Sequence, residues 1–177
     1  LDQLVSYEPR ELVLVVQPGM RLSTVEELLA GENQHLAFEP PHWGEEATVG
    51  GTVACGLSGP RRFKVGAARD FVLGIELVDG RGQRIRAGGR VVKNVTGYDV
   101  SRALTGSFGT LGVLTEICLK LWPRPETQAT LVVDGCDRVD ALALMLAWAA
   151  LPLEITGLAY LPEGGSPVGR LLARIEG

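Results

Sequence analysis

The sequence has few cysteines and no long apolar run, and each shortage excludes a class of protein. Cys55, Cys118 and Cys136 form no C-x-x-C pair, which argues against a disulfide framework, a zinc site or an iron–sulfur cluster in this chain, so we predict no metal site. The longest apolar run, residues 141–153, contains Pro152 and is shorter than the roughly 18 apolar residues of a membrane-spanning helix. No secretory signal is visible, so we expect a reduced, cytoplasmic setting.

Lysine is also scarce, and positive charge does not exceed negative charge. The chain has 17 Lys and Arg against 21 Asp and Glu, which gives a net charge of −4 at pH 7. No basic face is implied, so nucleic acid is not an expected partner. With 46% hydrophobic and 21% charged residues, the composition is that of a globular protein and excludes disordered and collagen-like chains.

Short apolar runs separated by turn residues predict an α+β fold. Strands are expected at 3–7, 11–16, 71–78, 83–87, 113–122, 130–133, 155–161 and 169–175. The order changes after Pro125, where a β-α-β-β pattern restarts. We therefore expect one domain over residues 1–125 and the beginning of a second, truncated domain over 126–177.

Helix starts are predicted from capping residues. Ser23 and Glu26 form a capping-box pattern for a helix that ends at Gly31, and Thr48 caps a short helix over 49–56. Thr96 or Asp99 caps a helix that ends at 104, and Asp137 caps one over 138–151. The last helix is expected to bury an apolar stripe in the core, made of Val139, Leu142, Met145 and Leu146.

Glycine is abundant, and several glycines fall into two clusters. The first holds Gly50, Gly51, Gly56 and Gly59, and the second Gly106, Gly109 and Gly112. Glycine lets the backbone approach a ligand closely, and free N–H groups in a first helical turn favour an anion. Neither a Walker A loop nor a G-x-G-x-x-G fingerprint is present, so those nucleotide-binding modes are excluded. Turns and close packing remain an alternative explanation of both clusters.

Four motifs resemble the vanillyl-alcohol oxidase / p-cresol methylhydroxylase class of flavoproteins. They are FEPPHWG (38–44), SGPRR (58–62), KNVTGYD (93–99) and GTLGVLTE (109–116). Within that class the resemblance is to the FAD-binding E subunits of glycolate oxidase (glycolate dehydrogenase), and it covers about residues 1–126. It implies the second α/β subdomain of the FAD-binding domain, with the N-terminal subdomain missing, followed by the start of an α+β cap domain.

The resemblance also implies which residues hold the flavin, which is FAD bound non-covalently. Those expected around the ring and ribityl chain are Gly50, Gly51, Thr52, Ala54, Cys55 and Ser58. Those expected to contribute main-chain contacts from the second cluster are Gly109, Thr110, Leu111, Gly112 and Val113. A second wall is expected from Lys93, Asn94, Gly97, Tyr98 and Asp99. The family's pyrophosphate loop lies ahead of the first strand here, so we expect these residues alone to bind FAD poorly.

By the same resemblance the chain is an oxidoreductase subunit that transfers hydride from glycolate or a related 2-hydroxy acid to flavin N5. Its expected partners are a homologous flavoprotein subunit and an iron–sulfur subunit, in the cytoplasm or peripheral to the inner membrane through the complex. One alternative is a non-catalytic flavin-binding or electron-relay subunit whose sister subunit is catalytic. A weaker alternative is a nucleotide-binding module without redox activity.

The sequence does not decide the roles of several individual polar residues, and we name no catalytic residue. His42 either touches flavin or substrate or is an ordinary loop residue, and Cys55 is expected to be a small packing residue. A basic run either binds phosphate or carboxylate groups or lies on a solvated loop or interface. It consists of Arg61, Arg62, Lys64 and Arg69. Asp70 is expected to be a structural hydrogen-bond acceptor.

Overall fold

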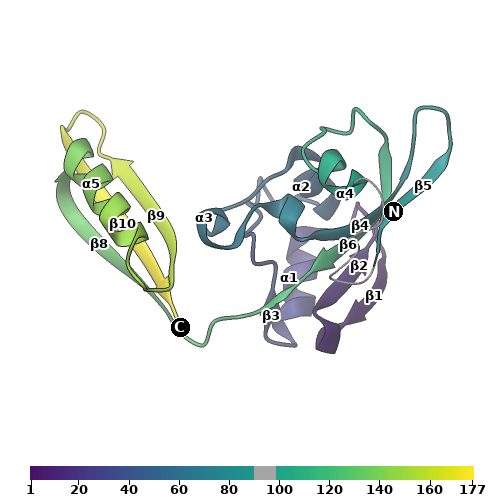
Figure 1. The fold of residues 1–177 in the computed structure, drawn as a ribbon, viewed down its shortest axis with the longest axis horizontal. Helices are drawn as coiled ribbons and strands as arrows, with labels where there is room; N and C mark the ends of the chain where they lie inside the picture. Colours follow the sequence, from purple (N-terminus) through teal and green to yellow (C-terminus); the bar gives the residue numbers. More distant parts are fainter. Residues whose placement is uncertain (90–98) are drawn as a thin grey trace. The chain divides into compact units, whose positions relative to one another are not determined.

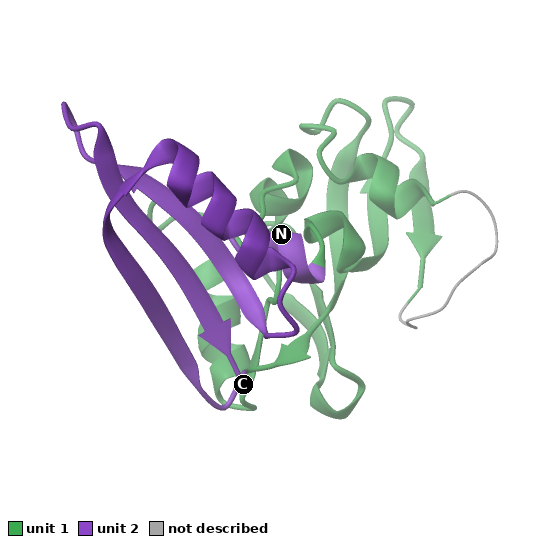
Figure 2. Cartoon of the chain, turned by 60° about the vertical axis from the view of Figure 1, so that its left-hand side comes forward, with its two compact units in different colours: residues 1–59, 66–124 green, residues 60–65, 125–177 purple. Residues whose placement is uncertain are grey.

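The computed structural model describes residues 1–89 and 99–177, which form two compact units (Figure 2). Unit 1 comprises Leu1–Gly59 and Gly66–Arg124, and unit 2 comprises Pro60–Val65 and Pro125–Gly177. The chain thus leaves unit 1 after Gly59, contributes a short segment to unit 2, and returns at Gly66. This excursion was not predicted from the sequence.

Unit 1 is built on a five-stranded sheet in the order β1-β2-β6-β4-β5 (Figure 1). Its strands are β1 (Leu4–Glu8), β2 (Val13–Val16), β4 (Val72–Val78), β5 (Arg84–Gly88) and β6 (Val113–Lys120). All four pairings are antiparallel. The β4–β5 hairpin confirms the turn that the sequence predicts between them.

The central strands of this sheet supply the core of unit 1. In β2, Leu14 lies opposite Leu119 and Val16 opposite Ile117 of β6, and all four side chains are fully buried. A run of β-branched and aliphatic residues is typical of such a strand, because both of its faces are covered. The expected mixture of strands and helices, an α+β fold, is confirmed.

Two short strands of unit 1 form a separate two-stranded sheet. They are β3 (Gln34–His35) and β7 (Trp122–Pro123), which pair antiparallel. The ring of Phe71 lies 5.5 Å from that of Phe38 and 6.0 Å from that of Trp122, centroid to centroid. This aromatic cluster fixes residues 31–47, which carry little regular structure of their own.

Helix α1 (Leu22–Ala30) begins without the capping box predicted for Ser23 and Glu26, so that expectation is wrong. Its N-cap residue is Arg21, whose side chain makes no capping hydrogen bond. The Leu22 N–H instead donates to the Ala47 carbonyl at 2.8 Å. A neighbouring loop therefore satisfies a donor that the sequence pattern assigned to a side chain.

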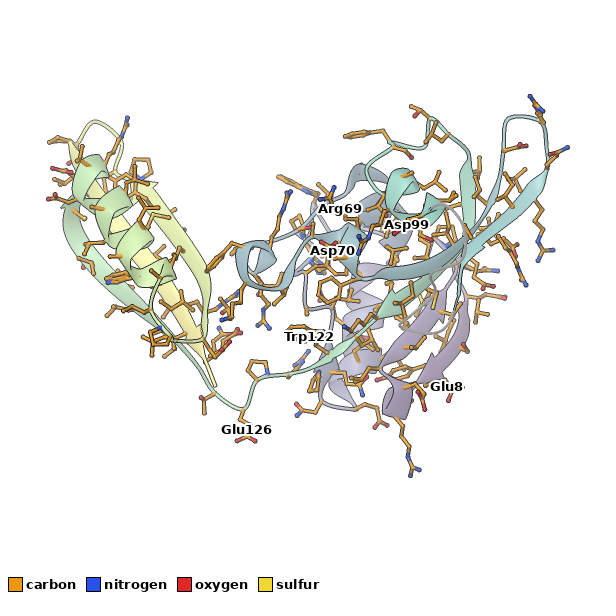
Figure 3. All side chains as sticks on the ribbon, in the orientation of Figure 1. Glu8, Arg69, Asp70, Asp99, Trp122 and Glu126 are labelled. Atoms are coloured by element: carbon orange, nitrogen blue, oxygen red, sulfur yellow. The ribbon has the colours of Figure 1, made fainter. Side chains whose placement is uncertain are left out.

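Helix α4 (Val100–Leu104) follows the residues that the structure does not describe. Asp99 caps it by accepting from the Arg102 N–H at 3.1 Å, as predicted, whereas the alternative cap Thr96 lies outside the described residues. Arg102 also pairs with Asp99 at 3.3 Å and with Asp70 at 3.6 Å; both carboxylates are labelled in Figure 3. Asp70, in the 3-10 helix Ala68–Asp70 (η2), accepts from the Ala67 N–H at 2.9 Å and so is the structural acceptor expected.

Unit 2 consists of a three-stranded antiparallel sheet with one long helix against it (Figure 1). Its elements are β8 (Gln128–Asp137), α5 (Arg138–Ala149), β9 (Ile155–Pro162) and β10 (Val168–Glu176), and β10 is the central strand. The segment Pro60–Val65 adds α3 (Arg62–Val65), which lies against β9.

The stripe predicted to be the core face of α5 is wrong. Val139 is 77%, Leu142 58% and Leu146 65% exposed. Ala141 is the buried residue of the helix, and Met145 is half-buried. The helix is apolar on both sides, so its periodicity could not tell the inward face from the outward one. No helix in the described part of the chain is long and apolar enough to span a membrane.

Mutation of the residue that caps α5 tests how the helix begins. The Asp137 carboxylate accepts from the N–H groups of Val139 and Asp140 at 2.8 and 2.9 Å. Removing it in Asp137→Ala should lower the free energy of unfolding by about 1 kcal/mol, because two helix donors lose their acceptor. Asp137→Asn keeps a capping oxygen and should stay near wild type in urea titrations followed by circular dichroism. Equal loss in both variants would contradict the capping role.

Candidate functional site

The first glycine cluster lies in helix α2 (Val49–Cys55), whose first turn has no free donor for a ligand. The N–H of Val49 donates to Met20 O at 2.9 Å and that of Gly50 to Pro18 O at 2.7 Å. The Gly51 N–H donates to Thr48 Oγ1 at 3.1 Å, the cap that the sequence predicts. The expectation that the Gly50 and Gly51 N–H groups bind an anion is therefore wrong, because the protein itself satisfies both.

The two glycines of this turn have different reasons to be glycine. A Cβ on Gly50 would lie 2.5 Å from Pro18 Cβ and 2.7 Å from its carbonyl oxygen, so close packing excludes a side chain there. A Cβ on Gly51 would meet only Thr48 Oγ1, at 3.3 Å. Gly50 is thus required by packing inside the protein, whereas Gly51 leaves bare backbone beside open space.

The carboxyl end of α2 holds the second glycine cluster in place. Gly106 N–H donates to the Val53 carbonyl at 3.0 Å, and Phe108 N–H donates to the Ala54 carbonyl at 2.8 Å. Gly56, which ends the helix with φ +66, approaches so closely that a Cβ there would lie 3.2 Å from Gly106 Cα. Clusters that are far apart in the sequence are therefore joined by hydrogen bonds through the helix end.

Both clusters line one cavity of about 420 Å³ in unit 1. Its lining residues are Leu1, Pro18, Gly19, Thr48, Gly50, Gly51, Ala54, Leu104, Ser107, Gly109, Gly112, Val113 and Leu114. None of these side chains is ionisable, and the only side-chain polar groups are the hydroxyls of Thr48 and Ser107. The cavity falls within the range of about 300–1,000 Å³ that is common for small-molecule sites.

Six of the residues predicted to contact flavin line this cavity. They are Gly50, Gly51, Ala54, Gly109, Gly112 and Val113. Sequence reasoning missed other lining residues, among them Pro18, Gly19, Leu104 and Ser107. Nothing in the sequence placed the segment with Pro18 and Gly19 beside α2.

The other five predicted residues do not line the cavity. Thr52 is buried, and Cys55 and Leu111 are exposed elsewhere on unit 1. Ser58 Oγ accepts from the Ala68 N–H at 2.9 Å, and Thr110 Oγ1 donates to the Ser107 carbonyl at 2.7 Å. Their contact with flavin stays a prediction. Lys93, Asn94, Gly97 and Tyr98 of the expected second wall lie outside the described residues.

The basic run after α2 does not line the cavity either. Arg61 is buried and pairs with Glu176, and Lys64 pairs with Glu154 at 3.2 Å, all within unit 2. His42 pairs with Glu26 at 3.0 Å in an exposed loop. Of the two readings that the sequence left open for Arg61 and Lys64, these ion pairs favour structural contacts over binding of phosphate.

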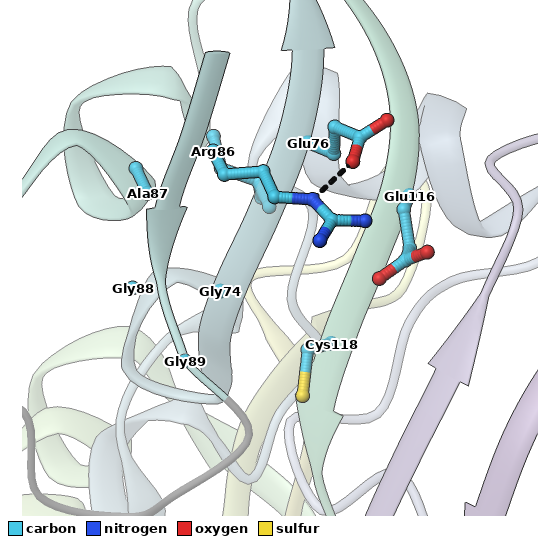
Figure 4. Close-up of a pocket in the computed structure, with 9 residues that line it drawn as sticks. Gly74, Glu76, Arg86, Ala87, Gly88, Gly89, Glu116 and Cys118 are labelled. Carbon is cyan, nitrogen blue, oxygen red and sulfur yellow. Dashed lines mark hydrogen bonds and ion pairs between the residues drawn. The ribbon is translucent and has the colours of Figure 1, made fainter.

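A smaller cavity of about 240 Å³ lies on β4, β5 and β6 and is charged (Figure 4). Glu76 is 7% exposed and pairs there with Arg84, at 2.6 Å, and with Arg86. Hydrogen bonds from these two guanidinium groups hold the pKa of Glu76 at about 2, below its usual 4.5. The Glu76 carboxylate is thus bonded to two arginines of the neighbouring strand and is poorly suited to act as a general base near neutral pH.

A family model matches the first half of the chain. Residues 1–88 match the family model described as "FAD binding domain". Over these residues the chain belongs to the FAD-binding domain family. FAD is the cofactor of this family, and both α2 and the turn that packs on it lie within the matched residues. The loop 106–113 lies beyond them, so its place in the cavity comes from the structure alone.

Several FAD-linked oxidoreductases are similar to the chain in sequence. It is 47% identical over 174 residues to "Glycolate oxidase subunit GlcE" of Escherichia coli (strain K12), across 98% of this chain and 48% of that protein. It is 39% identical over 144 residues to "Glycolate oxidase subunit GlcD" of Bacillus subtilis (strain 168), across 81% of this chain and 30% of that protein. A D-lactate dehydrogenase of Anaerostipes hadrus is 33% identical over 144 residues, again across 81% of this chain and 30% of that protein.

The chain spans about half or less of the length of these curated relatives. Among solved structures, an alkyldihydroxyacetonephosphate synthase matches 99% of this chain and 37% of its own, with a TM-score of 0.77 at 21% sequence identity. That likeness shows the fold alone. The names of these relatives describe oxidases and dehydrogenases.

The two glycines of α2 should respond oppositely to the same small change. Gly50→Ala forces a methyl group into Pro18 and should lower the free energy of unfolding by about 1–3 kcal/mol. Gly51→Ala meets only the Thr48 hydroxyl and should be neutral or stabilising by up to about 1 kcal/mol, since alanine favours helix. Denaturant titration measures both. Similar destabilisation by the two variants would contradict the packing described for Gly50.

The Glu76 pairs should make the fold sensitive to acid. Because the folded-state pKa lies below the usual 4.5, the pairs stabilise the protein above that pH, and this contribution is lost as the pH falls toward about 2. Glu76→Gln should therefore flatten the dependence of unfolding free energy on pH across this window. Glu45→Gln, at an exposed position, should leave the wild-type dependence intact. The idea fails if wild type and Glu76→Gln lose stability in parallel on acidification.

Proposed function

We propose that the chain is the FAD-binding part of a subunit of a glycolate (2-hydroxy acid) oxidase or dehydrogenase, and that the flavin lies in the 420 Å³ cavity. The observation that carries this proposal is that two glycine clusters from distant parts of the chain line one cavity, whose lining residues in the described part of the chain carry no ionisable side chain. The sequence similarity to glycolate oxidase subunits supports the choice of substrate class.

The properties of the cavity fit an isoalloxazine ring. The ring is planar, aromatic and uncharged in its oxidised form, so apolar walls and bare backbone can pack on its faces. Gly51 of the first cluster and Gly109 of the second both line the cavity. A Cβ on Gly109 would meet nothing within 4 Å, so the backbone there is open to a ligand. The hydroxyl of Ser107 is the polar group best placed on the second cluster to bond a ring heteroatom.

When bound, FAD would accept a hydride from the carbon that bears the substrate hydroxyl. The residues described here would orient the ring and exclude water from one of its faces. They offer no group to take the hydroxyl proton, because none of the lining side chains that the structure describes is ionisable and Glu76 is held by two arginines. The general base would therefore come from another part of the protein or from a partner subunit.

The same uncharged lining favours a second candidate function. A subunit that binds flavin for structure or for electron relay needs neither a base nor a cation to hold a substrate carboxylate. Under this proposal a homologous flavoprotein subunit oxidises the hydroxy acid, and an iron–sulfur subunit accepts the electrons. The names of the two similar proteins, glycolate oxidase subunits GlcE and GlcD, support a complex with homologous flavoprotein subunits. A cytoplasmic location, free or at the inner membrane through the complex, belongs to either proposal.

Blocking the cavity tests where the flavin lies. Gly51→Leu places a side chain in the open space beside α2 and should weaken FAD binding by about tenfold or more, because the added volume overlaps the ring. Gly80→Leu, at a turn position with no atom near its Cβ, is the matched control and should bind as wild type does. Quenching of flavin fluorescence during titration measures both. Wild-type affinity in Gly51→Leu would place the flavin elsewhere.

Reduction by substrate separates the two candidate functions. Adding glycolate to the flavin-loaded protein without oxygen should bleach the visible flavin absorbance if this subunit is catalytic. Bleaching that occurs only after a homologous flavoprotein subunit is added would instead support the electron-relay role.

A further inference from the structure

A tight turn in the second glycine cluster has an unusual residue at its first corner. The turn spans residues 107–110, in the loop between α4 and β6 (Figure 1), and the Thr110 N–H closes it by donating to the Ser107 carbonyl at 3.1 Å. Both central residues are left-handed, Phe108 with φ +54 and Gly109 with φ +71. This is the pattern of a type I′ turn, whose central positions favour glycine, asparagine and aspartate. Phenylalanine is unfavourable there, because its Cβ crowds the backbone when φ is positive.

The other left-handed residues in the described part of the chain have simpler explanations. Apart from glycines, they are Leu12, Asn33 and Glu39. Asparagine tolerates this conformation, and Leu12 and Glu39 are half-buried, so their side chains pack within the protein. Phe108 differs from all three because it is apolar and 73% exposed. Packing within the protein therefore does not account for a phenylalanine at this corner.

The backbone of Phe108 is held in place by hydrogen bonds on both sides. Its N–H donates to the Ala54 carbonyl at the end of α2, at 2.8 Å, and the Thr110 hydroxyl donates to the Ser107 carbonyl at 2.7 Å. The turn and its attachment to α2 thus impose the left-handed conformation. An aromatic side chain at this position makes the protein less stable than asparagine or glycine would.

The chain places Phe108 directly beside the 420 Å³ cavity. Its two neighbours, Ser107 and Gly109, both line the cavity, although Phe108 itself does not. None of the lining residues that the structure describes is aromatic, so the cavity walls have no side chain on which a planar ring could stack. Residues in unfavourable backbone conformations are common where a protein holds a ligand. An exposed phenyl ring beside an uncharged cavity is suited to cover an aromatic ligand there.

We propose that Phe108 contacts the bound flavin: its exposed side chain packs on the isoalloxazine ring held in the cavity. The inference rests on the function proposed above, which places FAD in this cavity. Contact between the two rings removes apolar surface of both from water, and this stabilises the bound state. The gain in binding offsets the loss of stability that the left-handed phenylalanine causes in the flavin-free protein.

One substitution should strengthen the fold and weaken flavin binding. Phe108→Asn places asparagine before Gly109, the favoured pair for this turn, and should lower the unfolding equilibrium constant of the flavin-free protein by about fivefold. It should also weaken FAD binding by about tenfold, because the stacked ring is lost. Urea titration followed by circular dichroism measures the first effect, and quenching of flavin fluorescence during titration measures the second.

Two variants serve as controls. Phe108→Tyr keeps both the aromatic ring and the unfavourable backbone, so stability and FAD affinity should stay within about twofold of wild type. Ile85→Asn likewise replaces an exposed apolar residue with asparagine, but Ile85 lies in the extended strand β5 and does not line the cavity. It should lower stability, since asparagine disfavours strands, and leave FAD affinity unchanged.

FMN shows which part of the dinucleotide Phe108 contacts, because it shares the isoalloxazine ring with FAD but lacks the adenine. Phe108→Asn should weaken binding of FMN and FAD by the same factor. A loss confined to FAD would overturn the proposal, because the phenyl ring would then lie against the adenine.

Two further results count against the proposal. Wild-type affinity for both flavins in Phe108→Asn would mean that the side chain makes no contact with the ring. Lower stability of the flavin-free variant would mean that the phenyl ring supports the fold instead. If wild type binds neither FAD nor FMN, the proposed function itself fails, whereas unchanged binding in the variant contradicts the role of Phe108 alone.

Discussion

Two main-chain hydrogen bonds at the end of α2 determine the candidate site. The carbonyls of Val53 and Ala54 accept from Gly106 and Phe108, and this joins a loop near residue 108 to a helix near residue 53. Without them each glycine cluster would be an isolated surface turn. With them, bare backbone from both clusters faces one cavity, and the glycines in its lining have no side chain that must be ordered. Such a site loses little conformational entropy when it binds a rigid ring.

The sequence predicted much of the framework because local signals were strong. Thr48, Asp99 and Asp137 cap their helices as expected, and the β4–β5 hairpin follows its turn residues. Tertiary contacts decided the exceptions. The start of α1 is satisfied by the Ala47 carbonyl, which no local pattern can reveal. The stripe on α5 faces outward because the opposite side of that helix is equally apolar and packs on the sheet.

The candidate site was likewise predicted in part from local sequence patterns, whereas the rest depends on tertiary contacts. Glycine spacing and family motifs led to both walls of the cavity, but they could not tell which glycines face it. Gly50 is glycine because Pro18 packs against it, and its N–H is used within the protein. Gly51, one residue later, carries the open face. Ser58 accepts from the Ala68 N–H, a role that is invisible in the motif.

The excursion of residues 60–65 has a consequence for how the chain acquires its structure. Arg61 leaves the ribosome 115 residues before Glu176, its partner in unit 2. Until β10 has been made, residues 60–65 have no sheet to bind and the Arg61 guanidinium must stay in water. Contacts between residues so distant in sequence slow folding, because a long loop must close before they form. Completion of the loop that follows α2 is thus postponed until β10 has been synthesised.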